Sequence, residues 1–446
     1  VTESAPDGPT LRGPREAWVP GAETVEADDL DYDPTAYDSL TTCSLGWPCL
    51  SFDFLRDGLG APRSQYPHEL FFVSGSQAAP GKANYLSLIR ATNVTQGRHG
   101  AKGRKKPKAK SASDSESSDS ESSDSDDSEA EEEQSSERLH TRRLAHPGGE
   151  VNRVRSMPQT PGVVAAWASS GLVSVWDLGK ELKDLQAEPV PDPDKAERLV
   201  RRSALHAHGH SAEGFALDWS LAAAGSLASG DGRGSIHVWT PAGAGKWSVG
   251  AAYKGHGGSV EDLQWSPVES TVFASGSCDR SIRIWDTRAP GKAMLAVENT
   301  HEGDVNVLSW SAQTPHMLAS GGDDALLRVW DLRIFAQRGA VASLKHHRGP
   351  VTSVEWCPHE ASMLLTTGAD HQTAVWDLSL ERDPEEELAL QAVGNALMPE
   401  DVPPQLLFVH AGQHDVKEGH WHPHIPGLMA TTAADGFNLF KPANVC

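Results

Sequence analysis

The sequence predicts an all-β protein with the architecture of a seven-bladed β-propeller, and this prediction depends on one repeated motif. Between His256 and Asp377, a His is followed 29 residues later by a Trp-Asp pair, three times in succession. A second Trp lies nine residues after each His, and successive histidines are 45 and 46 residues apart. A fixed period of this length that ends in Trp-Asp is typical of one four-stranded propeller blade. The motif residues are His256, Trp265 and Trp285, then His301, Trp310 and Trp330, then His347, Trp356 and Trp376.

Weaker copies of the motif, which is that of WD40 repeats, lie on both sides of these three. In each copy a His precedes an aromatic residue by 29 or 30 residues. The pairs are His146 with Trp176, His210 with Trp239, and His410 with Phe440. Alternating apolar residues within 46–100 predict a first blade, and residues 141–442 then hold the remaining blades. The total is seven.

The N-terminal part differs in character from the repeats. Residues 1–27 are rich in turn formers and lack periodicity, so we expect a disordered N-terminal arm. Residues 28–45 are predicted to hold a short N-terminal α-helix. Asp33 is placed to cap this helix, and Tyr37 and Leu40 lie three residues apart, on one helical face.

A charged segment at 101–140 is predicted to be a disordered insertion, placed between the first and second blades. Its second part, 111–137, holds twelve Asp or Glu and twelve Ser but no basic residue, so it cannot bury enough apolar surface to fold. The serines with acidic residues three positions later suggest phosphorylation by acidophilic kinases. The basic part is typical of a nuclear localisation signal, with a solvated linker as the alternative, and consists of Lys102, Arg104, Lys105, Lys106, Lys108 and Lys110.

Two gaps between successive motif histidines are unusually long, at 64 and 63 residues. We therefore expect loop insertions near 179–205 and 381–405. Large loops on a regular scaffold are common places for binding sites.

Composition limits the classes of function. The formal net charge is −22, which disfavours direct contact with nucleic-acid backbone and suits a basic protein partner. The five cysteines are odd in number and contain no Cys-x-x-Cys pair, which favours reduced thiols over a disulfide framework or a zinc site. No apolar run reaches 18 residues, so we expect neither a signal peptide nor a membrane span.

Each regular repeat carries a polar set: the His, a Ser or Thr ten residues before the Trp, an Asp six before it, and the Trp itself. A catalytic triad also uses Ser, His and Asp, but it is needed once, whereas this set recurs. We interpret it as a buried chain of hydrogen bonds and expect no enzyme and no cofactor site. The set is His256, Ser275, Asp279 and Trp285, then His301, Ser320, Asp324 and Trp330, then His347, Thr366, Asp370 and Trp376. Ser170 and Arg233 take the Asp position before Trp176 and Trp239, so those two blades are predicted to be less regular.

Two further patterns have functional interpretations. His420, His422 and His424 alternate and could face a metal, although a strand-end turn is favoured because no carboxylate or thiol completes the set. Residues 285–288 and 330–333 read Trp-Asp-x-Arg, which resembles substrate receptors of cullin ubiquitin ligases. The alternative is that each Arg pairs with a neighbouring carboxylate.

Several segments go beyond a general repeat and together resemble the histone-binding WD40 family, in particular its glutamate-rich branch. The resemblance runs from about residue 28 to 441, and the acidic insertion fits that branch. The segments are Gly46–Asp53, Glu213–Ser220, Ser259–Pro267 and Pro403–His410.

This resemblance implies a monomeric scaffold of the nucleus and nucleolus, which could shuttle through the cytoplasm and escort a basic large-subunit ribosomal protein. Histones are the first alternative client and a cullin-ligase receptor the second alternative function. A basic client helix is expected between the N-terminal helix and the Pro-Pro loop. The implied groove residues are Tyr32, Asp33, Tyr37, Leu40, Glu400, Asp401, Pro403 and Leu406, and the implied acidic rim residues are Glu213, Glu261, Asp304 and Glu355.

Overall fold

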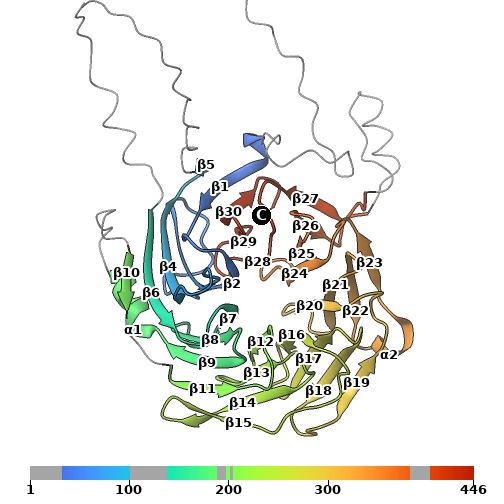
Figure 1. The fold of residues 1–446 in the computed structure, drawn as a ribbon. Helices are drawn as coiled ribbons and strands as arrows, with labels where there is room; N and C mark the ends of the chain where they lie inside the picture. Colours follow the sequence, from blue (N-terminus) through green and yellow to red (C-terminus); the bar gives the residue numbers. More distant parts are fainter. Residues whose placement is uncertain (1–32, 101–137, 188–196, 201–203, 382–401, 446) are drawn as a thin grey trace, which may run out of the picture.

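Seven β-sheets surround a central axis (Figure 1). The computed structural model describes residues 33–100, 138–187, 197–200, 204–381 and 402–445. Within these ranges the chain forms a seven-bladed β-propeller, as the sequence predicted. The first strand of each blade lines the axis.

Blades two to six are four-stranded and are named here from the inner strand outward. The second blade is β7 (Val151–Ser156), β8 (Val163–Ala168), β9 (Leu172–Asp177) and β11 (His206–Gly209). The third is β12 (Ala216–Trp219), β13 (Leu227–Gly230), β14 (Ile236–Gly243) and β15 (Lys246–Val249). The fourth is β16 (Val260–Trp265), β17 (Val272–Ser277), β18 (Ile282–Asp286) and β19 (Ala293–Val297). The fifth is β20 (Val305–Trp310), β21 (Met317–Gly322), β22 (Leu326–Asp331) and β23 (Ala342–Lys345), with α2 (Phe335–Arg338) between the last two. The sixth is β24 (Val351–Trp356), β25 (Met363–Gly368), β26 (Thr373–Asp377) and β27 (Leu406–His410).

The first and seventh blades each have a fifth strand. The first is β2 (Cys49–Phe54), β3 (His68–Ser76), β4 (Asn84–Val94), β6 (Arg138–His146) and β10 (Glu197–Val200). The seventh is β28 (Glu418–Trp421), β29 (Met429–Ala433), β30 (Gly436–Pro442), β1 (Tyr37–Cys43) and β5 (Gly97–Gly100).

The N-terminal helix predicted within 28–45 is wrong for the described part of that range. Only Pro34–Ala36 is helical, as one 3₁₀ turn that Asp33 caps by accepting from the Thr35 N–H at 2.8 Å. The chain then extends as β1, which pairs antiparallel with β30, opposite Leu40 to Phe440. Without β1, the edge of β30 would leave unpaired backbone groups, and that long-range demand outweighs a weak local helix signal.

The charged insertion also lies elsewhere than predicted. β6 follows it in sequence but pairs with β4, opposite Leu86 to Leu144, and so completes the first blade. The insertion therefore interrupts the first blade rather than separating the first blade from the second. Residues 101–137 themselves lie outside the described residues.

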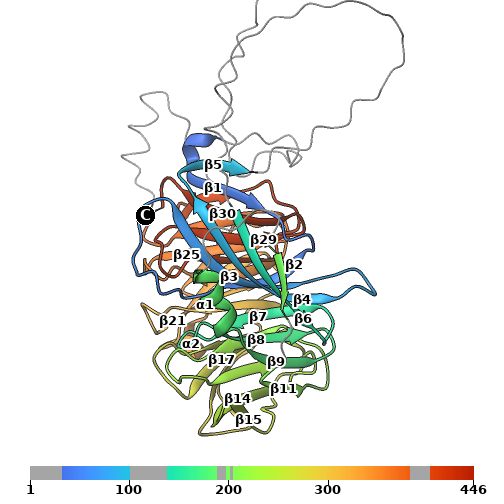
Figure 2. The ribbon, with the colours of Figure 1, turned by 90° about the vertical axis from the view of Figure 1, so that its left-hand side faces the viewer.

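The expected loop near 179–205 contains regular structure. Helix α1 (Gly179–Ala187) buries Leu182 and Leu185 and packs against β4 and β6 (Figure 2). Arg90 Nη1 donates to the Leu185 carbonyl at 2.8 Å and so satisfies one C-terminal carbonyl of this helix. β10 then pairs parallel with β6, so the insertion covers the outer edge of the first blade. Most of the other predicted loop, 382–401, lies outside the described residues.

The apolar core lies between neighbouring blades. Ala228 and Ile236 of the third blade cluster with Val260 and Leu263 of the fourth. A Cβ on Gly276 would lie only 2.8 Å from a methyl carbon of Val305 in the next blade, so glycine allows this close approach.

The three regular blades share one hydrogen-bond chain. In the fifth blade, His301 Nδ1 lies 2.8 Å from Asp324 and its Nε2 lies 2.7 Å from Ser320 Oγ, which also accepts from Trp330 Nε1 at 2.8 Å. The corresponding His-to-hydroxyl distances are 2.6 Å to Ser275 and 2.8 Å to Thr366 in the neighbouring blades. His256 and His347 each lie 3.0 Å from their aspartates, Asp279 and Asp370.

The two blades expected to be less regular differ from each other. In the third blade the prediction is wrong, because Asp231, eight residues before Trp239, lies 3.2 Å from His210 and completes the chain. In the second blade the hydroxyl comes from Ser174 on the third strand, and it accepts from Trp176 at 2.9 Å. His146 Nδ1 there lies 3.4 Å from the Gly149 carbonyl, where a regular blade has its Asp.

The second Trp of the repeat has a role that the sequence did not reveal. Its indole N–H donates to a backbone carbonyl on the inner strand of the preceding blade, at 3.0 to 3.2 Å. The pairs are Trp219 with Arg155, Trp265 with Asp218, Trp356 with Ser309, and Trp421 with Glu355. Trp310 is an exception and donates to Pro315 of its own blade.

Replacing Ser320 with Ala is expected to lower the free energy of unfolding by about 2 kcal/mol, because it leaves His301 Nε2 and Trp330 Nε1 buried without a partner. Urea unfolding followed by Trp fluorescence measures the change. Ser343→Ala, at an exposed position on β23 of the same blade, is the matched control. Equal unfolding midpoints for the two variants would contradict the proposed role of the chain.

Candidate partner-binding surface

The chain ends meet at the junction of the sixth and seventh blades. The Tyr37 ring on β1 lies 5.3 Å from the Phe408 ring on β27, edge to face. Leu407 and Phe408 are half-buried, and the Asn444 side chain donates to the Leu407 carbonyl at 3.1 Å. We call the surface formed by Asp33, Tyr37, Pro403, Leu407 and Phe408 the edge surface.

The structure separates the groove residues that the resemblance implied. Leu40 is 5% exposed and packs with Phe440, whereas Leu406 is 7% exposed and packs in a different cluster of the sixth blade. Both therefore belong to the propeller core and present little surface to a partner. Asp33 is exposed and Pro403 is half-buried, and both lie at the surface. Tyr32, Glu400 and Asp401 lie outside the described residues, as does the basic segment 102–110.

Beneath the edge surface, His410 joins three strands. Its Nε2 accepts from Asn438 Nδ2 at 2.9 Å, and its Nδ1 lies 2.8 Å from the Tyr37 hydroxyl. The ring also stacks on Phe440, at 4.2 Å between centroids. Burial lowers the pKa of His410 to about 4, so the neutral ring is the stable form.

The four implied rim residues lie in different surroundings. Glu213 is exposed in the loop before β12. Glu261 accepts from the Cys278 thiol at 3.2 Å, and burial together with Asp304 and Glu261 raises the pKa of that thiol. Glu355 accepts from the Trp421 N–H at 2.8 Å and lies 3.0 Å from His420 Nδ1, so it links the sixth blade to the seventh.

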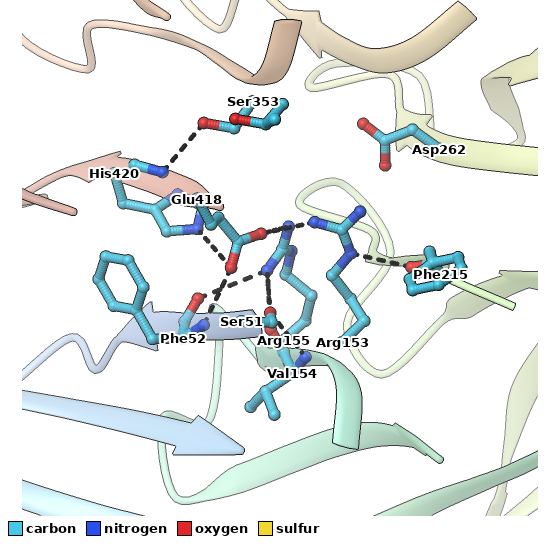
Figure 3. Close-up of polar contacts among 12 residues, drawn as sticks. Ser51, Phe52, Arg153, Val154, Arg155, Phe215, Asp262, Ser353, Glu418 and His420 are labelled. Carbon is cyan, nitrogen blue, oxygen red and sulfur yellow. Dashed lines mark hydrogen bonds and ion pairs between the residues drawn. The ribbon is translucent and has the colours of Figure 1, made fainter. Parts of the chain in front are cut away.

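A charged cluster on the axis was missed by the sequence analysis (Figure 3). Glu418 of β28 is almost fully buried and pairs through one oxygen with Arg153, at 2.6 Å, and Arg155, at 2.7 Å. Its other oxygen accepts from the Phe52 N–H at 2.9 Å and lies 3.5 Å from His420 Nε2. The signal was present in the sequence, because residues two apart on a strand face one side, as Arg153 with Arg155 and Glu418 with His420 do.

The pairing sets the charges of this cluster. Burial alone would raise the pKa of Glu418, but Arg155, Arg153 and His420 outweigh it and hold that pKa well below its usual value. Burial likewise opposes protonation of His420, yet the Glu355 and Glu418 carboxylates raise its pKa to about 10. Glu418 is therefore a carboxylate and His420 a cation at neutral pH.

The alternating histidines do not converge on a common point. His420 faces Glu355 and Glu418, and His422 Nδ1 accepts from the His424 N–H at 3.0 Å. His424 lies 3.5 Å from Asp57. Among the residues that the structure describes, no group of three or more His, Cys, Asp or Glu side chains is arranged to hold a metal ion.

Both Trp-Asp-x-Arg motifs form the same exposed pair. Arg288 Nη2 lies 2.6 Å from Asp286, and its Nε lies 3.0 Å from both carboxylate oxygens. Arg333 repeats this arrangement with Asp331 in the next blade, at 2.6 Å. The arginine side chains are 74% and 67% exposed, so each pair presents a fixed guanidinium to solvent.

In the described ranges, no helix combines the length and apolar character needed to cross a membrane. The described surfaces are instead rims, edges and a charged axis on a rigid ring of sheets. These features define a WD40 propeller that serves as a scaffold for protein partners.

The relationship to known proteins is specific. The family model for the histone-binding protein RBBP4 and its counterpart in the CAF1 complex matches residues 28–95, and that of the "WD domain, G-beta repeat" matches 247–286, 293–331 and 339–377. The chain is 48% identical over 439 residues to Glutamate-rich WD repeat-containing protein 1 of Dictyostelium discoideum, a match that covers 97% of this chain and 86% of the relative. It is 44% identical to Protein HEAT STRESS TOLERANT DWD 1 of Arabidopsis thaliana, over 97% of this chain and 92% of the relative. It is 37% identical to Ribosome assembly protein rrb1 of Schizosaccharomyces pombe, over 95% of this chain and 84% of the relative. The chain belongs to this glutamate-rich WD-repeat family.

The neutral state of His410 predicts a pH-dependent stability. Its folded pKa, about 4, lies below the ordinary value of 6.5, so the unfolded state binds more protons between these values. Stability should therefore be complete above about pH 6.5 and fall by up to about 3 kcal/mol as the pH drops to about 4. Urea unfolding at several pH values, compared between the wild-type chain and His410→Gln, isolates this contribution from that of His210. An identical pH slope in both proteins would contradict it.

Proposed function

We propose that this protein is a ribosome-assembly factor that escorts a basic large-subunit ribosomal protein. The observation that carries the proposal is the similarity, over 84% of its length, to a relative whose name states a role in ribosome assembly. The net charge of −22 supports it, because a basic client that binds polyanions indiscriminately needs an acidic partner. In keeping with this role, the basic segment 102–110 acts as a nuclear localisation signal, and the protein works in the nucleus and nucleolus.

The client binds along the edge surface. Tyr37, Leu407 and Phe408 offer half-buried apolar contacts there, with the exposed carboxylate of Asp33 beside them. The ends of the chain that flank the acidic insertion, Gly100 on β5 and Arg138 on β6, belong to the seventh and first blades. The insertion is therefore tethered to the two blades on one side of the edge surface, and its carboxylates raise the local negative charge. An apolar stripe flanked by Lys and Arg is the client chemistry that fits.

Reversing the charges of the Pro-Pro loop tests this assignment. Glu400→Lys combined with Asp401→Lys should weaken client binding at least about tenfold, or about 1.4 kcal/mol, and raising the salt concentration should weaken the wild-type complex. The client is first identified by affinity purification at moderate salt, and its Kd is then measured by fluorescence anisotropy. Glu269→Lys with Asp184→Lys, two exposed residues on other blades, is the charge-matched control. Unchanged affinity in the loop variant would remove the loop from the assignment.

The same purification discriminates between clients. The histone-binding alternative is favoured only by the family model that matches residues 28–95. Recovery of core histones in place of a ribosomal protein would overturn the proposed client and leave the scaffold role intact.

A second candidate function is that of a ubiquitin-ligase substrate receptor. Two observations favour it: the paired exposed guanidinium groups of Arg288 and Arg333, and the similarity to a plant relative whose name contains DWD. If this function holds, Arg288→Ala with Arg333→Ala should lose a co-purifying cullin scaffold and keep the basic client. Arg233→Ala with Lys292→Ala, also exposed, is the control. The candidate fails if no cullin scaffold co-purifies with the wild-type chain.

A further inference from the structure

The axis of the propeller gathers carboxylates from many blades. Their side chains lie on the inner strands β2, β12, β16, β24 and β28 and face one another around the channel. They are Asp53, Asp218, Asp262, Glu355 and Glu418. Such a channel has the charge that a Lys or Arg side chain of a basic client would seek.

Four of these carboxylates are committed to holding neighbouring blades together. Each accepts a hydrogen bond from a backbone N–H on the inner strand of the next blade, at 2.7 or 2.8 Å. The pairs are Asp53 with Ser156, Asp218 with Trp265, Asp262 with Leu308, and Glu355 with Trp421. Burial raises the pKa of Asp53, Asp218 and Asp262, which weakens their charge further. Glu418 remains the strongly ionised group, since its pKa is held low.

Two arginines of the chain itself occupy the place in front of Glu418. Arg153 Nε also donates to the Phe215 carbonyl of the third blade at 2.9 Å, and Arg155 Nη1 donates to the Val154 carbonyl at 2.8 Å. These bonds orient both guanidinium groups toward one carboxylate oxygen, as Figure 3 shows. Because they are already positioned, they bind without the loss of translational freedom that a separate ligand would incur.

We propose that Arg153 and Arg155 are built-in ligands of the axial channel, which exclude the Lys and Arg side chains of basic proteins from Glu418. The inference rests on the proposed function in one respect, that the client is basic. Its consequence is selectivity: a basic client binds at the edge surface, and a loose basic tail gains no anchor on the axis. Removing an arginine should convert the channel into a cation site, because an ionised carboxylate left unpaired in a buried place attracts a replacement cation.

Chemical rescue tests the proposal in the full chain. Arg153→Ala should unfold at a lower temperature than the wild type, and methylguanidinium chloride should raise its Tm relative to an equal concentration of sodium chloride. A fluorescent arginine-rich peptide should bind the variant at least tenfold more tightly than it binds the wild-type chain. In the double variant Arg153→Ala, Glu418→Gln, both the rescue and the gain in peptide affinity should disappear, because the carboxylate charge is gone.

A milder variant keeps the test decisive if Arg153→Ala does not fold. Arg153→Gln retains an N–H for the Phe215 carbonyl while removing the charge, and near-UV circular dichroism checks its fold. If folded Arg153→Gln gains neither methylguanidinium stabilisation nor peptide affinity over the wild type, the proposal is overturned. Neither readout uses the ribosomal client, so a wild-type chain that fails to bind that client would contradict the proposed function alone.

Discussion

The pairing of β1 with β30 is the interaction on which the rest of the propeller depends. It joins residues 37–43 to residues 436–442, so that the last blade contains both ends of the folded chain. Without it, β30 would present an open edge and Leu40 would leave the core it shares with Phe440. Closing a loop of this length costs little more entropy than closing one half as long, about 0.6 kcal/mol per doubling. A short strand with a buried side chain can therefore hold the ring closed.

Glu418 closes the ring at its inner side. This one carboxylate of the seventh blade contacts the Phe52 N–H of the first blade and two arginines of the second. Removing one partner of such a buried pair typically costs about 3–5 kcal/mol, because the remaining charge stays in a place poor in water. Outer closure by strand pairing and inner closure by charge thus act on the same blade. The geometry of that blade in turn fixes the edge surface, since Tyr37 and His410 meet there.

The polar residues between blades share a common physical purpose. The His, hydroxyl, Asp and Trp chains satisfy groups that would otherwise be buried without partners, and the second Trp of most repeats binds a carbonyl of the preceding blade. Their repetition explains why a set of residues that looks catalytic is structural. Function then lies where the repeat is broken: at the composite seventh blade, on the axis, and beside the interrupted first blade.

The sequence by itself determined the number and order of the blades and the hydrogen-bond chains of blades four to six. These features follow from residues at fixed spacing along a regular strand pattern, so periodicity is enough to read them. The edge of the charged insertion could not be read in this way, because β6 carries no motif and is defined only by its partner β4.

The tertiary structure decided the remainder. Asp33 does cap a turn as its local signal predicted, but the following residues form a strand because their partner β30 lies near the other end of the chain. Asp231 replaces the expected Asp position because a hydrogen bond requires proximity in space and not a fixed spacing in sequence. Leu40 and Leu406, close in the expected groove, are buried in separate clusters, and Arg153 and Glu418 meet although 265 residues separate them. Such contacts depend on how the ring closes, and closure is a property of the whole chain that no local segment encodes.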